Sequence, residues 1–166
     1  MSNKSGTIKG HRFHGDPARF EEIANYISNH FGRDVRYIAD VAGGQGMLSR
    51  FLNKQGYETE VIDPRGWTLA GVPNRPEEYQ ASMADYYDLV IGLHPDEALR
   101  PVAESAKVRP ILVVPCCNFW DRNQKLGRDA LLSEMEGYFR QNNIPFVQVV
   151  FNFKGPNNIG FVTGKI

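Results

Sequence analysis

The side chains best suited to bind a ligand gather in one stretch, Asp40–Gly66, which reads DVAGGQGMLSRFLNKQGYETEVIDPRG. Gly43, Gly44 and Gly46 lie between a predicted buried strand and a predicted helix, where missing side chains let a ligand approach the backbone closely. Asp63 ends the next predicted strand, and a carboxylate there can accept hydrogen bonds from the two hydroxyls of a ribose. The stretch therefore predicts a nucleoside site at one edge of a sheet.

A second group of reactive side chains follows two later predicted strands. The segment GLHPDEA spans residues 92–98, and VPCCNFW spans residues 114–120. Because the carboxyl ends of parallel strands share one edge of a sheet, we expect both segments to meet around the ligand. The side chains that they bring there are His94, Asp96, Glu97, Cys116, Cys117, Asn118 and Trp120.

Each of these side chains has a predicted functional role and a purely structural alternative. His94 is the expected base, since a neutral imidazole accepts a proton near pH 7, and Asp96 and Cys117 are the other catalytic candidates. Asp96 and Glu97 also suit the first turn of a helix, and cysteines at a strand end are commonly small packing groups. The predicted substrate contacts in this region are Glu97, Cys116, Asn118 and Trp120.

Strands and helices alternate along the chain. Strands are predicted over residues 35–43, 57–64, 87–94, 110–117, 145–153 and 159–166. Helices are predicted over residues 16–31, 46–56, 95–107 and 127–143, and residues 65–85 are predicted to be mostly loop. The pattern indicates an α/β fold, a three-layer α/β/α Rossmann-like sandwich with a mostly parallel sheet, strand order of roughly 3-2-1-4-5 and an antiparallel C-terminal hairpin.

Composition limits the class of protein. The 166 residues suit one domain spanning 1–166, and 42% hydrophobic residues suffice for a core. Equal numbers of basic and acidic residues, 19 each, argue against a protein that coats nucleic acid. No apolar run approaches the ~20 residues of a membrane helix, so we expect no membrane partner. The only two cysteines are adjacent and poorly placed to pair with each other, which favours a cytoplasmic location.

The N-terminal segment, residues 1–15, is polar and basic, and we expect it to be flexible. Arg12 is predicted to contact phosphates and Phe13 to stack on a base. A solvated tail without a partner is the alternative interpretation.

The segment IADVAGGQG resembles motif I of the class I S-adenosylmethionine-dependent methyltransferases, D-x-G-x-G-x-G. Ala42 replaces the first glycine of that motif, which we expect to require a negative φ at this position. The resemblance implies S-adenosyl-L-methionine as the cofactor, with its ribose on Asp63. The cofactor contacts that it implies are Asp40, Ala42, Gly43, Gly44, Gly46, Asp63 and His94.

Two alternatives to this cofactor remain. The run from Gly44 to Ser49 partly matches the dinucleotide fingerprint G-x-G-x-x-G/A, so NAD is a rival ligand. The short chain and the closing hairpin do not suit an NAD-dependent enzyme with a separate substrate domain. A glycine-rich turn that binds no ligand is the other alternative.

The acceptor prediction depends on a shorter resemblance. GLHPDEA, followed by a strand that ends in PCC, is similar to the eukaryotic tRNA uridine 2′-O-methyltransferases, which implies methyl transfer to RNA. A methyltransferase acting on a small molecule or a protein remains open, as does a non-catalytic protein that works with a partner chain. Adjacent cysteines are poor joint ligands for one tetrahedral ion, so we predict no metal site.

Overall fold

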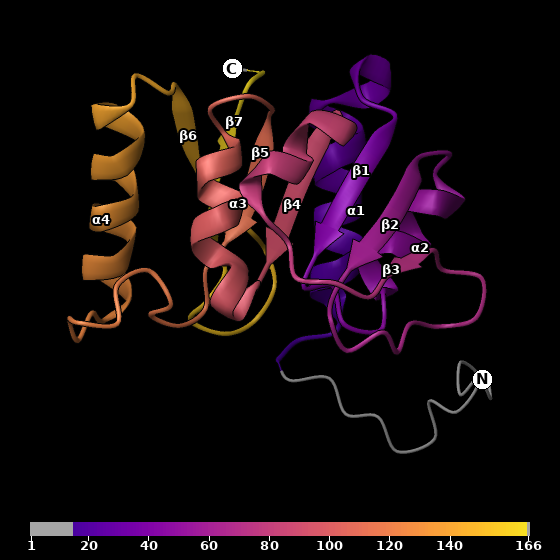
Figure 1. The fold of residues 1–166 in the computed structure, drawn as a ribbon, viewed down its shortest axis with the longest axis horizontal. Coiled ribbons are helices and arrows are strands. Elements are labelled where there is room, and N and C mark those ends of the chain that lie inside the picture. The colour runs from indigo at the N-terminus through magenta and orange to yellow at the C-terminus, as the bar shows by residue number, and fades with distance from the viewer. Residues whose placement is uncertain (1–14, 166) are drawn as a thin grey trace.

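The computed structural model describes residues 15–165, so the predicted substrate contacts Arg12 and Phe13 lie outside the described residues. Within the described range, seven strands form one sheet in the order β3-β2-β1-β4-β5-β7-β6 (Figure 1). The strands are β1 (Tyr37–Val41), β2 (Glu58–Ile62), β3 (Asn74–Arg75), β4 (Leu89–Leu93), β5 (Ile111–Val114), β6 (Phe146–Val150) and β7 (Ile159–Thr163). The predicted fold class is confirmed.

The sheet is parallel from β3 to β5, and β7 runs antiparallel to both β5 and β6. Strands β4 and β5 are buried along their whole length, as continuous apolar runs predict. The two-residue strand β3 lies inside the region that the sequence assigns to loop, because so short an edge strand leaves no alternating pattern.

Helices cover both faces of the sheet. The α-helices are α1 (Ala18–His30), α2 (Met47–Lys54), α3 (Leu99–Ser105) and α4 (Arg128–Gln141). Side chains of α1 and α2 pack in the core on one face, and those of α3 and α4 pack in the core on the other (Figure 1). The carboxyl ends of β1, β2, β4 and β5 therefore open at one edge between the two helical layers.

The predicted helix over residues 95–107 is shorter than expected. Asp96–Ala98 forms a 3-10 turn, and α3 begins only at Leu99. Pro101 then lies in the first turn of α3, where its missing N–H has no helical partner to lose. None of the helices in residues 15–165 has the length and apolar character that crossing a bilayer requires.

Candidate ligand-binding site

The loop after β1 has a backbone that needs glycine. Gly44 and Gly46 have φ of +60° and +82°, in the left-handed region that L side chains rarely adopt. A Cβ on Gly43 would lie 2.6 Å from the carboxylate of Asp40. The N–H of Gly46 donates to the carbonyl of Gly43 at 3.0 Å, which closes the turn before α2. The turn brings backbone and no side chain to the cleft at Gly43 and Gly44.

Ala42 does not have the backbone conformation that the sequence analysis required. Its φ is +53°, whereas a negative φ was expected. Two other non-glycine residues that follow sheet strands, His94 and Asp96, have φ of +51° and +49°. Positive φ at such residues costs about 1–3 kcal/mol each and persists only where the surrounding structure imposes it. All three line the same cleft, which marks this edge of the sheet as a candidate site.

Asp40 carries a buried carboxylate at the floor of the cleft. Its side chain is 1% exposed, and the hydroxyl of Ser49 donates to its Oδ2 at 2.8 Å. Burial raises the pKa of Asp40 to about 6, the Ser49 hydrogen bonds oppose that rise, and the nearby Asp63 adds to it. A cation arriving beside Asp40 would stabilise its charged form.

Asp63 is not available for a ribose as predicted, because its carboxylate already has four donors. The backbone N–H and Nε of Arg65 donate to Oδ1, each at 3.0 Å. Nη2 of Arg65 donates to Oδ2 at 2.7 Å, and the N–H of Gly44 donates to the same oxygen at 3.0 Å. Burial acts to raise the pKa of Asp63, but the Arg65 hydrogen bonds outweigh it and hold the pKa below its usual value.

Arg65 therefore stands where the expected ligand would bind. Its guanidinium lies 3.6 Å from a Cβ built on Gly44 and 5.0 Å from the ring centre of Trp67. Its side chain is 52% exposed, so only its head is tied to the protein. A ribose can reach Asp63 only after Arg65 moves.

His94 is held as a neutral imidazole with a defined tautomer. Burial is the main cause that lowers the pKa of His94, and the charge of Arg19 adds to it. Nε2 of His94 lies 2.8 Å from the carbonyl oxygen of Asn157, which can only accept. Nε2 therefore carries the proton, and Nδ1 keeps the lone pair that a base needs.

The cysteine segment contacts the acidic segment after β4. The thiol of Cys116 donates to Oδ1 of Asp96 at 3.4 Å. Burial raises the pKa of Cys116, and the charge of Asp96 raises it further, so this sulfur stays protonated at neutral pH. Cys117 is exposed, and the carboxylate of Glu97 pairs with Arg122 at 2.9 Å on the surface.

Neither Asn118 nor Trp120 lines the cleft at Gly43 and Gly44, although Asn118 lines a smaller pocket between the cysteine segment and α4. Nδ2 of Asn118 donates to the carbonyls of Asp121 and Gln124, so the side chain stabilises the loop in which it lies. Trp120 is 6% exposed and packs edge-on against Tyr138 of α4. An aromatic side chain this large gains more by burial between α3 and α4 than by standing at the cleft.

Three cavities meet at this edge of the sheet. The glycine cleft, about 460 Å³, is lined by Asp40, Ala42, Gly43, Gly44, Gly46, His94, Asp96, Cys116 and Cys117, among others. The turn cavity, about 620 Å³, is lined by Asp63, Arg65, Tyr79, Glu97 and Cys117, among others. The leucine pocket, about 240 Å³, is lined by Leu126, Leu131, Leu132, Ile159, Cys116 and Cys117, among others. Cys117 lines all three, so the cavities adjoin one another there.

Three polar residues that line the glycine cleft, Arg19, Gln45 and Arg65, were not among the predicted site residues. Arg19 of α1 lines the cleft with a guanidinium whose Nη1 donates to the carbonyl of Asp16 at 2.9 Å. Gln45 also lines the cleft, and its Oε1 is buried inside the protein without a hydrogen-bond partner among residues 15–165. The contact of Arg65 with Asp63 was predictable in part, because Asp-Pro-Arg-Gly is a turn sequence. In such a turn the aspartate carboxylate accepts a hydrogen bond from the backbone N–H of the residue two positions later.

Metal ligation has no support in the described part of the chain. No three histidine, cysteine, aspartate or glutamate side chains among residues 15–165 gather as a metal ion would require. The prediction of no metal site stays a prediction.

No protein-family model matches the sequence, and no curated protein matches it significantly. Solved structures do share the fold. An O-methyltransferase family protein from Burkholderia thailandensis superposes with a TM-score of 0.53 at 12% identity, covering 87% of this chain and 55% of its own. The magnesium protoporphyrin IX methyltransferase of Synechocystis, with bound S-adenosylmethionine, superposes with a TM-score of 0.56 at 13% identity. The match covers 88% of this chain and 76% of that protein.

A third neighbour is the 1,6-didemethyltoxoflavin-N1-methyltransferase of Burkholderia thailandensis, solved with its acceptor and S-adenosylhomocysteine. Its TM-score is 0.54 at 14% identity, with coverages of 89% and 77%. At these identities the likeness establishes the fold, which is that of the class I methyltransferases. The chain spans little more than half the length of the first of these neighbours.

Proposed function

We propose that this protein is an S-adenosylmethionine-dependent methyltransferase. The observation that carries the proposal is the glycine cleft, where a side-chain-free turn and the buried carboxylate of Asp40 close the end of β1. Two of the three structural neighbours hold S-adenosylmethionine or S-adenosylhomocysteine in the same fold.

The residues of the cleft fit the amino-acid end of that cofactor. The buried carboxylate of Asp40 suits its positive charges, and Gly43 leaves room beside that carboxylate. The turn cavity adjoins the glycine cleft at Arg65 and Ala42, which suits an extended ligand with a nucleoside at its other end. The fit at Asp63 requires Arg65 to move aside.

When bound, S-adenosylmethionine supplies a methyl group on a positively charged sulfur. The protein has to align an acceptor with that methyl and remove the acceptor's proton as the new bond forms. His94 is suited to the second task, because it lines the glycine cleft and its Nδ1 keeps a lone pair while Nε2 contacts the Asn157 carbonyl. The raised pKa of Cys116 argues against a thiolate nucleophile at that residue.

The acceptor is part of the proposal. Two neighbours solved with ligands are named for small molecules, a porphyrin and a toxoflavin precursor, which supports a small-molecule acceptor. The predicted RNA acceptor, including a tRNA ribose, has no support from the comparisons and depends partly on residues outside 15–165. A cytoplasmic location remains part of the proposal, supported by the two free cysteines.

Tritium transfer from S-adenosylmethionine into fractionated RNA, protein and small molecules tests the function. We expect label in the small-molecule fraction with the wild-type chain and its loss with Gly43→Ala, because the added Cβ would collide with Asp40. Gly137→Ala is the matched control, since a Cβ there meets nothing within 4 Å. Absence of label from every fraction would contradict an enzymatic role.

One observation favours a second function. Because Arg65 occupies both oxygens of Asp63, the fold also suits a non-catalytic protein that acts with a partner chain. Calorimetry separates the two: a methyltransferase binds S-adenosylhomocysteine, whereas a protein with a permanently filled site does not.

A further inference from the structure

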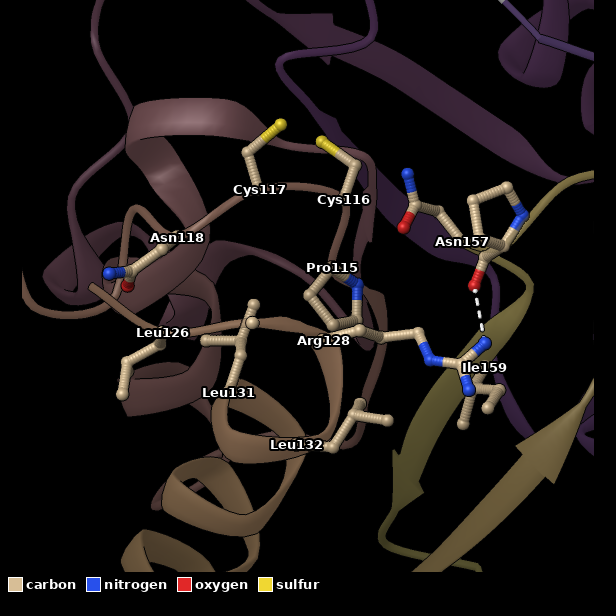
Figure 2. Close-up of a pocket in the computed structure, with 12 residues that line it drawn as sticks. Pro115, Cys116, Cys117, Asn118, Leu126, Arg128, Leu131, Leu132, Asn157 and Ile159 are labelled. Carbon is tan, nitrogen blue, oxygen red and sulfur yellow. Dashed lines mark hydrogen bonds between the residues drawn. The ribbon is translucent and has the colours of Figure 1, made fainter.

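The leucine pocket lies between the cysteine segment, the start of α4 and the start of β7. Figure 2 shows Leu131 and Leu132 of α4 on one side of it and the sulfur atoms of Cys116 and Cys117 at the other. Leu131 and Leu132 are 4% and 7% exposed, so the walls are fixed by core packing. Pro115 and Ile159 complete a mainly apolar lining.

The pocket adjoins the proposed cofactor site. Cys116, Cys117 and Asn157 line both the leucine pocket and the glycine cleft. The backbone carbonyl of Asn157 also fixes the tautomer of His94, so the proposed base stands at the boundary between the two cavities. A molecule seated among the leucines would present one end to that boundary.

The size of the pocket limits what enters it. Its volume of about 240 Å³ is below the ~300–1,000 Å³ of sites for drug-sized ligands. A porphyrin or a folded RNA segment is too large for it, whereas a single substituted ring is not.

The charges around the pocket limit the chemistry of the acceptor. Arg128 is the one charged side chain among its described lining residues; its Nη1 donates to the carbonyl of Pro156 at 3.1 Å (Figure 2), and its Nε pairs with the exposed Asp129 at 3.2 Å. A cation disfavours a protonated amine and favours a group that loses a proton. A phenol has a pKa of about 10 and an alkyl thiol about 8.5, and a thiol on an aromatic ring is more acidic still, so each can pass its proton to a neutral imidazole.

We propose that the leucine pocket is the methyl-acceptor site and takes one-ring phenols or aromatic thiols. This inference rests on the proposed methyltransferase function. The acceptor O–H or S–H bond breaks as its O–CH₃ or S–CH₃ bond forms, the proton passes to Nδ1 of His94, and the methyl–sulfonium electron pair stays on the cofactor sulfur, leaving a neutral thioether.

Gly127→Trp tests the pocket with a matched control. Gly127 lines the pocket and a Cβ there meets nothing within 4 Å, so the indole starts from open space at its rim. Gly137→Trp adds the same side chain at a second open glycine, in the middle of α4 and outside the lining. Leu131→Ala is a complementary variant that enlarges the pocket.

The probes are 4-methylphenol and 4-methylbenzenethiol, titrated into ¹⁵N-labelled protein saturated with S-adenosylhomocysteine. We expect at least one probe to shift the amide signals of Leu131 and Ile159. Gly127→Trp should weaken the binding of that probe at least tenfold, and Gly137→Trp should weaken it less than twofold. Leu131→Ala should improve binding of the larger 2-naphthol relative to the one-ring probe. Melting temperatures check that each variant is folded.

The outcomes separate the two proposals. If S-adenosylhomocysteine binds but neither probe shifts these amides, or Gly127→Trp leaves probe binding unchanged in a folded protein, the acceptor assignment is wrong and the methyltransferase proposal stands. If Gly127→Trp is unfolded, the binding of 2-naphthol relative to the one-ring probe in Leu131→Ala decides: an unchanged ratio contradicts the acceptor assignment. If S-adenosylhomocysteine itself does not bind, both proposals fail.

Discussion

Asp40 lies within β1 and Asp63 directly follows the neighbouring strand β2, and the surroundings of the two carboxylates have opposite effects on their pKa values. They are 1% and 2% exposed. Asp40 has one side-chain donor, Ser49, and its pKa is raised to about 6. Asp63 has four donors, three of them from Arg65, and its pKa is lowered.

The difference teaches that burial alone does not set the charge of a carboxylate. Asp40 lies deeper in the protein, and its neutral Ser49 donor does not reverse the effect of burial, whereas the charged Arg65 donors reverse it at Asp63. Asp40 retains an unmet preference for a nearby cation, which suits a ligand site. The preference of Asp63 is already met inside the protein, so ligand binding there has to displace Arg65.

The largest expected effect comes from removing the fully paired carboxylate. Asp63→Ala should lower the free energy of unfolding by about 2–3 kcal/mol, because it leaves the Gly44 N–H and the Arg65 head without their acceptor. Urea denaturation measures this. Asp85→Ala is the control, since Asp85 is 72% exposed and should change stability by less than about 0.5 kcal/mol. Equal losses in both variants would remove the distinction between the two carboxylates.

Freeing Asp63 should come next in size. Arg65→Ala should strengthen S-adenosylhomocysteine binding about tenfold, or about 1.4 kcal/mol, because the ribose no longer competes with the guanidinium. Isothermal titration calorimetry measures the affinity. Arg75→Ala removes an arginine of similar exposure that pairs with Glu60, and should leave the affinity unchanged. Weaker binding in Arg65→Ala would instead make Arg65 a ligand contact.

The raised pKa of Asp40 predicts a pH-dependent stability. Its folded pKa of about 6 lies above the unfolded value of about 3.9, so its contribution is complete below about pH 4 and is lost as the pH rises through 6. Asp40→Asn should lack this loss, so its stability relative to the wild type should rise steadily between pH 4 and 7. Urea denaturation across that range is the measurement, and parallel curves for the two proteins would show that Asp40 is not perturbed.

The smallest expected effect concerns the backbone beside Asp40. Ala42→Gly should stabilise the protein by about 0.5–1 kcal/mol, because glycine adopts a φ of +53° without strain. Ala103→Gly in α3 should lose about 1 kcal/mol, as expected for glycine in a helix. Thermal denaturation compares them. A loss of stability in both would mean that Ala42 is not strained.

The fold was predictable because it depends on long patterns. Continuous apolar runs locate β4 and β5, and alternation with helices fixes the parallel order around β1. The glycine loop was predictable for the same reason, since a strand–turn–helix boundary places it at the sheet edge.

The site's local geometry was less predictable. The φ of Ala42 and the burial of Trp120 depend on contacts distant in sequence, which no short pattern encodes. The pairing of Arg65 with Asp63 is a matter of side-chain rotamers within one turn. The sequence thus indicates which residues approach the site, whereas their hydrogen bonds decide which of them is free to bind.

The most direct test of the account is a titration of ¹⁵N-labelled protein with S-adenosylhomocysteine. We predict saturable shifts of the Gly43, Gly44 and Gly46 amides at micromolar ligand, together with a shift of the Arg65 amide as its bond to Asp63 breaks. Unchanged signals for these four residues at millimolar ligand would contradict the assignment of the glycine cleft as a cofactor site.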